Sequence, residues 1–173
     1  MSYYKIENLE EYFKHYKKSI REPKKFWDRI ASENFTWYQE WDNVIDFNMA
    51  EAEIKWFTNA KVNITKNCID RHLAKRGEKT AIIFEPNDPK EEALHITYNE
   101  LYERVSKMAN VLREQGVKKG DRVCIYLPMI PELAVSLLAC ARIGAIHSVV
   151  FAGFSASAVA SRINDCECKM VIT

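Results

Sequence analysis

The stretch Phe151-Ala-Gly-Phe-Ser155 combines residue types that could receive a nucleotide or a phosphate. It follows an apolar run and precedes a helix that we expect from Ser155 onward. Small side chains at Ala152 and Gly153 would let a ligand approach the backbone, and the free amides of a helix N-terminus attract anions. Phe151 offers an aromatic ring to a base. A strand-to-helix turn that needs one glycine accounts for the same residues, and the stretch by itself slightly favours that simpler interpretation.

Other catalytic motifs are absent from the sequence or have structural explanations. The chain contains no Gly-x-x-x-x-Gly-Lys-Ser/Thr phosphate loop, no Gly-x-Ser-x-Gly nucleophile motif and no Gly-x-Gly-x-x-Gly dinucleotide fingerprint. Ser155 has no evident base. His147 lies in an apolar run, so we expect it to pack in the interior, and Glu132 stands at a helix start, where its charge suits the helix dipole.

The five cysteines are Cys68, Cys124, Cys140, Cys166 and Cys168. Their number is odd, and Cys124 and Cys140 fall inside an expected strand and an expected helix, which is typical of a reduced cytosolic chain. Cys166 and Cys168 could supply half of a metal site. Because no second pair exists at ligand spacing, we expect a structural role for them.

Charge and composition argue against several kinds of partner. The net charge is +1, with 47% hydrophobic and 28% charged residues, as in an ordinary globular protein. Such a charge gives no electrostatic reason to bind nucleic acid or an anionic membrane. No apolar stretch reaches the ~18 residues of a membrane span, and the first residues lack the apolar core of a signal peptide. We therefore expect no nucleic acid partner, no membrane and a cytoplasmic location.

Three apolar runs, at residues 122–127, 146–151 and 169–173, are continuous rather than alternating. This pattern is typical of parallel strands that are covered on both faces. The runs begin 24 and then 23 residues apart, with helices expected at residues 131–143 and from Ser155 onward. Connections of this length form right-handed βαβ crossovers. The sequence therefore predicts an α/β fold, a parallel sheet with helices on both faces.

Shorter elements are expected between the N-terminal part and this sheet. Residues 63–76 read as one helix, and strands at residues 80–84 and 94–97 could form a hairpin. Thr97 and Glu100 have the spacing of a capping box, which predicts the start of an amphipathic helix.

Residues 1–60 differ in character from the rest of the chain. Helices are expected from a cap at Asn8 and from Pro23. The aromatic stretch that follows favours a segment that docks onto a larger body over a base-stacking groove, because glycine is absent and basic residues are not interleaved. We expect a helical, aromatic-rich extension at residues 1–60 and an α/β part at residues 61–173.

The third apolar run coincides with the last residues of the chain. A parallel sheet calls for another connection there, so we expect the chain to be part of a longer protein. The run would leave an unpaired apolar edge that includes Met170, Val171 and Ile172, and such edges promote association. We therefore expect the isolated chain to self-associate or to use its N-terminal extension as a cover.

Several stretches resemble one enzyme family. Residues 116–123 are similar to a segment shared across the adenylate-forming superfamily of acyl-CoA synthetases, luciferases and peptide-synthetase adenylation domains. Residues 126–132, 139–151 and 153–155 are more similar still to the AMP-forming acetyl-CoA synthetase family, and residues 67–73 also match it.

The resemblance implies an N-terminal extension at residues 1–60 and the opening βαβαβ part of the large adenylate-forming domain at residues 61–173. Such enzymes activate acetate with ATP and Mg²⁺ to acetyl-AMP, release pyrophosphate and transfer the acetyl group to CoA. The family's phosphate loop, acetate pocket and catalytic lysine lie beyond residue 173. No catalytic residue is therefore expected in this chain, and we expect the chain alone to be inactive.

The family's Phe-Gly-Gly-Phe loop lines the CoA adenine site and maps onto Phe151, Ala152, Gly153 and Phe154. The resemblance therefore favours a CoA site at Phe151, Ala152 and Gly153 over a plain turn. Ala152 replaces the family's usual glycine and slightly tightens the site. Two alternatives remain: another acyl-CoA ligase such as propionyl-CoA synthetase, or a stand-alone CoA- or nucleotide-binding module. The partners implied are acetate, ATP, CoA and the rest of the synthetase chain.

Overall fold

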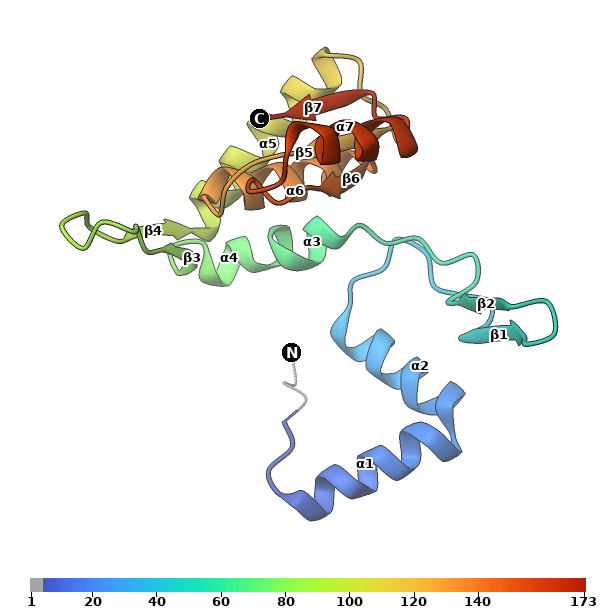
Figure 1. The fold of residues 1–173 in the computed structure, drawn as a ribbon. Coiled ribbons are helices and arrows are strands. Elements are labelled where there is room, and N and C mark those ends of the chain that lie inside the picture. The colour runs from blue at the N-terminus through green and yellow to red at the C-terminus, as the bar shows by residue number, and fades with distance from the viewer. Residues whose placement is uncertain (1–4) are drawn as a thin grey trace. The chain divides into compact units, whose positions relative to one another are not determined.

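The computed structural model describes residues 5–173, which form two compact units, one ending at Val62 and one from Asn63 to Thr173 (Figure 1). The second unit contains a parallel sheet of three strands in the order β6-β5-β7. The strands are β5 (Arg122–Ile125), β6 (Ile146–Val149) and β7 (Met170–Ile172). They are joined by α6 (Pro131–Ile143) and α7 (Ala156–Asp165). The α/β class with a parallel sheet is confirmed.

The strand order decides where the two connecting helices lie. The first connection runs from the central strand β5 to one edge, and the second runs from that edge across β5 to the other. These two steps have opposite directions, so right-handed crossovers place α6 and α7 on opposite faces of the sheet. The carboxyl ends of all three strands lie at the same end of the sheet, because the strands are parallel.

The expected burial of all three strands is wrong for the two edge strands, β6 and β7, and Val171 of β7 is 41% exposed. Val123, Cys124 and Ile125 of β5 are fully buried, whereas Ile146 and Val149 of β6 are 54% and 47% exposed. His147, which we expected to pack in the interior, is also exposed. The apolar pattern shows that a strand suits a sheet interior, but in the part of the chain that the structure describes β6 lies at an edge and pairs with a strand, β5, on one side only.

The core of the second unit lies between the sheet, α6 and the long helix α5 (Tyr98–Glu114). The capping box predicted at Thr97 and Glu100 is present, with both reciprocal hydrogen bonds. Helix α6 begins with Pro131, as expected, and ends at Gly144 in the left-handed region with φ 76°. The fully buried side chains of this core include Val105, Leu112, Val123, Ile125, Ala139 and Cys140.

Residues 63–76 do not form the single helix that we expected. They divide into α3 (Ile64–Cys68), a 3₁₀ turn (Asp70–His72) and α4 (Leu73–Arg76). Asp70 in the turn accepts two hydrogen bonds from Arg142 near the end of α6, with Nη2–Oδ1 and Nη1–Oδ2 distances of 2.6 and 3.3 Å. A long-range ion pair thus lies at the break in the helix. The expected hairpin follows as β3 (Thr80–Phe84) and β4 (Leu94–Thr97), which are antiparallel.

The first unit contains α1 (Leu9–Arg21), α2 (Pro23–Asn34) and an antiparallel hairpin of β1 (Ile45–Asn48) and β2 (Glu53–Trp56). The cap at Asn8 and the helix start at Pro23 are confirmed. The sequence did not reveal the hairpin. Beside it lies an aromatic cluster in which neighbouring ring centroids are 4.9–6.3 Å apart; its members are Trp27, Trp37, Trp41, Trp56 and Phe57. Many of the aromatic residues therefore pack against one another.

We expect Asp70→Asn to weaken the attachment of residues 64–76 to α6. The change removes the charge from a partly buried, doubly hydrogen-bonded ion pair, so the free energy of local opening should fall by about 1–2 kcal/mol. Amide hydrogen exchange of residues 64–76 in the complete polypeptide would measure it. The matched control is Glu103→Gln, which removes the charge from the exposed pair with Lys107 and should change exchange very little. Equal effects of both variants would contradict the prediction.

Candidate functional site

The loop predicted from the sequence lies beyond the carboxyl end of β6. Phe154 N–H donates to Phe151 O at 3.0 Å, which closes a tight turn over residues 151–154. Ser155 then caps α7, and its Oγ accepts from Ala158 N–H at 3.4 Å. The loop and the helix start are therefore arranged as the sequence predicted. They lie at the carboxyl ends of the strands, where open α/β sheets bind ligands.

Tyr126 holds this loop in place. It directly follows β5, and its hydroxyl lies 2.9 Å from both Ala152 O and Phe154 O. One hydroxyl hydrogen is thus shared between two carbonyl groups of the loop. No role for Tyr126 was expected from the sequence, where it lies inside the apolar run of residues 122–127. The contact with Ala152 spans 26 residues of chain, so the local pattern does not indicate it.

Gly153 lies directly against the ring of Phe151. A Cβ atom added at Gly153 would lie 2.6 Å from Phe151 Cε1, closer than real contacts allow. The backbone offers no competing reason for a glycine here, since the described glycines with positive φ are Gly116, Gly120 and Gly144. The glycine therefore makes room for the ring, which is 63% exposed.

An arginine lies beside the loop. The Arg162 guanidinium on α7 lies 4.8 Å from the centroid of the Phe154 ring. The rings of Phe154 and Phe151 meet edge to face, with centroids 6.0 Å apart and an interplanar angle of 84°. An exposed ring, a cation and the first amides of α7 together suit a ligand with an aromatic base and a negative charge.

The other residues considered from the sequence do not join this loop. His147 and Glu132 are exposed, and Cys166 and Cys168 lie in the turn before β7. Within residues 5–173, no three side chains of His, Cys, Asp and Glu type come together as metal ligands. In the same part of the chain, no helix has the length and apolarity required to cross a membrane.

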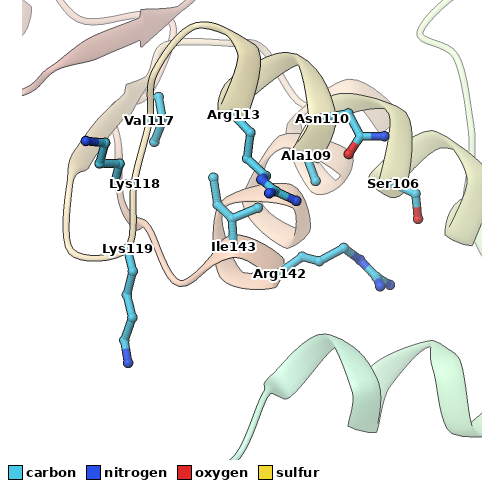
Figure 2. Close-up of a pocket in the computed structure, with 9 residues that line it drawn as sticks. All are labelled: Ser106, Ala109, Asn110, Arg113, Val117, Lys118, Lys119, Arg142 and Ile143. Atoms are coloured by element: carbon cyan, nitrogen blue, oxygen red, sulfur yellow. The ribbon is translucent and has the colours of Figure 1, made fainter.

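A separate pocket of about 550 Å³ lies near the amino ends of the strands, and the loop does not line it (Figure 2). Its lining residues are Ser106, Ala109, Asn110, Arg113, Val117, Lys118, Lys119, Arg142 and Ile143. Arg113 and Arg142 occupy the last turns of α5 and α6, where cations stabilise the carbonyl end of a helix. Two of the four basic side chains in the lining thus have a structural explanation.

Two protein-family models match the chain. The AMP-binding enzyme family model matches residues 69–173, and the model named acetyl-coenzyme A synthetase N-terminus matches residues 12–68. The chain therefore belongs to the AMP-binding enzyme family. The resemblance to the acetyl-CoA synthetase family, expected from the sequence, is confirmed.

Individual relatives point in the same direction. The acetyl-coenzyme A synthetases of Magnetococcus marinus and Desulfatibacillum aliphaticivorans are 55% and 56% identical to the chain, over 96% and 94% of its length. The match covers 26% and 25% of those relatives, so the chain spans about a quarter of their length. The structure of acetoacetyl-CoA synthetase from Streptomyces lividans is similar over 90% of this chain and 24% of its own, with a TM-score of 0.82 at 28% identity.

We expect Tyr126→Phe to loosen the loop without unfolding the sheet. The change removes only the hydroxyl that bonds to Ala152 O and Phe154 O, which is worth about 1 kcal/mol. Amide exchange at Phe154 should become several-fold faster. The amide of Ala145, which donates to Cys140 O at the end of α6, is the internal control. Unchanged exchange at Phe154 would show that the hydroxyl does not hold the loop.

Proposed function

We propose that this chain is the N-terminal part of an AMP-forming acetyl-CoA synthetase. The complete enzyme would convert acetate, ATP and CoA to acetyl-CoA, AMP and pyrophosphate through acetyl-AMP. The observation that carries the proposal is the identity of 49–56% to proteins named acetyl-coenzyme A synthetase, over at least 91% of the chain.

The chain would contribute two parts to that enzyme. We assign residues 1–60 to the N-terminal extension and residues 61–173 to the first part of the adenylating domain. The remaining nucleotide-binding segments, the acetate pocket and the catalytic lysine would come from the rest of the synthetase polypeptide. Mg²⁺ would be bound with ATP there, because the described residues bring together no cluster of metal ligands.

We assign the loop of Phe151, Ala152 and Gly153 to the binding of the CoA adenine. Phe151 presents a largely exposed ring. Because Gly153 has no side chain, nothing at that position displaces the ring. Arg162 and the first amides of α7 add positive charge nearby. The loop would bind and orient CoA, while bond making and breaking would take place on other parts of the enzyme.

The location that we propose is the cytoplasm. All five cysteines are free thiols in the structure, and a reducing compartment keeps thiols in that state. Acetate, ATP and CoA would be the small-molecule partners.

The direct test is a pair of assays. The complete polypeptide should catalyse acetate-dependent exchange of pyrophosphate into ATP and should form acetyl-CoA when CoA is added. Residues 1–173 alone should catalyse neither reaction, because the sequence contains no phosphate-binding loop to stabilise the charge that develops at phosphorus. Exchange by purified residues 1–173 would refute the assignment of the chemistry to the rest of the chain.

Other acyl substrates should be compared with acetate in the same assay. The solved structure with the similar fold is an acetoacetyl-CoA synthetase, so acetoacetate and propionate are the competitors to compare with acetate. A higher kcat/KM for either acid would replace acetate in the proposal and leave the reaction type unchanged.

We expect Gly153→Leu to weaken CoA binding selectively. A side chain at this position must displace the Phe151 ring, so the KM for CoA should rise by about tenfold or more. Acetate-dependent pyrophosphate exchange should stay nearly intact, because it does not use CoA. Ala152→Gly, which removes one methyl from the same loop, is the matched control and should not raise the KM for CoA. Parallel loss of both half-reactions and of melting temperature in Gly153→Leu would restore the plain-turn interpretation.

A further inference from the structure

Three of the five thiols gather where α7 ends and β7 begins. Cys166 follows the last residue of α7, and its Sγ lies 3.0 Å from Cys168 Sγ. Cys124 on the central strand β5 lies close to this pair. Cys124 is fully buried, whereas Cys166 and Cys168 are only partly buried. The accessible thiols of the cluster are thus Cys166 and Cys168, which are separated by one residue.

The end of α7 forces these two side chains together. Glu167 N–H donates to Asn164 O at 3.2 Å, and Cys168 N–H donates to Ile163 O at 3.0 Å. Glu167 has φ 49°. Two such bonds around a left-handed residue define a Schellman motif, in which the chain turns back over the last helical turn. The cysteines occupy the positions on either side of the left-handed residue, so the turn brings their side chains to the same side.

Arg122 holds this turn from the first position of β5. Its Nε donates to Cys166 O at 2.7 Å, and its Nη2 donates to Glu167 O at 3.2 Å. The same Nη2 lies 3.0 Å from Glu167 Oε2. In return, Lys169 N–H donates to Arg122 O at 2.9 Å. The turn is therefore attached to the most buried strand of the sheet, which limits how far the two thiols can separate.

The hydrogen bonds of the two thiols indicate which of them donates its proton to the other sulfur atom. Cys166 Sγ donates to Arg162 O at 2.9 Å, so its single proton is engaged and Cys168 is the donor between the two sulfur atoms. Burial, and then the hydrogen bond and charge of Cys166, raise the pKa of Cys168 to about 12. The last two of these causes would disappear once Cys166 is no longer a thiol or thiolate.

We propose that Cys166 and Cys168 form a modification site, a dithiol that a low-molecular-weight disulfide such as oxidised glutathione converts into an intramolecular disulfide. The sulfur atoms need to approach by only about 1 Å to reach bonding distance. Cys166 must also release Arg162 O, so the last turn of α7 loses one side-chain hydrogen bond.

The reaction is a two-step exchange. The Cys166 thiolate attacks one sulfur of the small disulfide, which breaks its S–S bond and releases one small thiol. Cys168 then loses its proton and attacks Cys166 Sγ, which expels the second small thiol and forms the bond between Cys166 and Cys168. Both cysteines lose their protons, and two electrons reduce the small disulfide to two thiols.

Cys124 is the competing partner for Cys168, and its burial keeps it out of the first step of the exchange. Cys124 has no accessible surface, so a small disulfide cannot reach it while the sheet is intact. The small disulfide therefore reacts first with a thiol of the accessible pair, whose Sγ atoms lie 3.0 Å apart.

The test uses the complete reduced polypeptide with excess oxidised glutathione, followed by alkylation of the remaining thiols. Trypsin cuts after Arg162 and Lys169, so one peptide, residues 163–169, contains both cysteines. We expect this peptide to carry no alkyl group and to be lighter than the reduced form by two hydrogen atoms. Cleavage after Glu167 should leave two pieces joined through sulfur until dithiothreitol separates them.

Single-thiol variants provide the controls. Cys166→Ser should leave Cys168 alkylated or joined to one glutathione, with no bridge inside the peptide. Cys68→Ser should leave the bridge unchanged, because Cys68 belongs to another part of the unit. Three outcomes would overturn the proposal: two alkylated cysteines in residues 163–169, two stable glutathione adducts there, or a link from Cys168 to the peptide that contains Cys124.

Discussion

The complete burial of β5 is the constraint on which the second unit depends. Its side chains at Val123, Cys124 and Ile125 have no accessible surface, and its backbone is paired with β6 on one side and β7 on the other. Helices α5 and α6 pack together over this part of the core. Because β6 and β7 are both parallel to β5, the position of β5 fixes both ends of the sheet. It thereby also positions the loops that could bind a ligand.

Residues at the two ends of β5 extend this order to the surface. Tyr126, just beyond the carboxyl end, bonds to the loop of Phe151 to Phe154. Arg122, at the amino end, bonds to the turn that contains Cys166 and Cys168. Both contacts connect a rigid, buried strand to a segment that would otherwise be held only by its own turn. A loop held in one shape loses less conformational entropy when a ligand binds.

The family and the proposed role rest on different observations. Membership of the AMP-binding enzyme family follows from a match over residues 69–173. Binding of CoA at the loop is our proposal, and the geometry of Phe151, Gly153 and Arg162 supports it. The same helix, α7, has the proposed CoA loop at its start and the proposed dithiol at its end. The two proposals are independent, because one concerns reversible ligand contacts and the other a covalent bond between sulfur atoms.

The sequence by itself determined the features that depend on neighbours in the chain. The capping box at Thr97 and the bounds of α6 at Pro131 and Ile143 were predicted correctly, because caps and turns are set by bonds between residues a few positions apart. The loop after β6 was also predicted from residue types, whereas its assignment to CoA came only from the resemblance to the acetyl-CoA synthetase family. Only the tertiary structure decided that β6 lies at an edge with His147 exposed, and that Tyr126 holds the loop. It also decided that the helix expected at residues 63–76 is divided, with Asp70 in the turn paired to Arg142. These features depend on contacts between residues far apart in the chain, and the apolar pattern of a segment does not specify which distant partner it will meet.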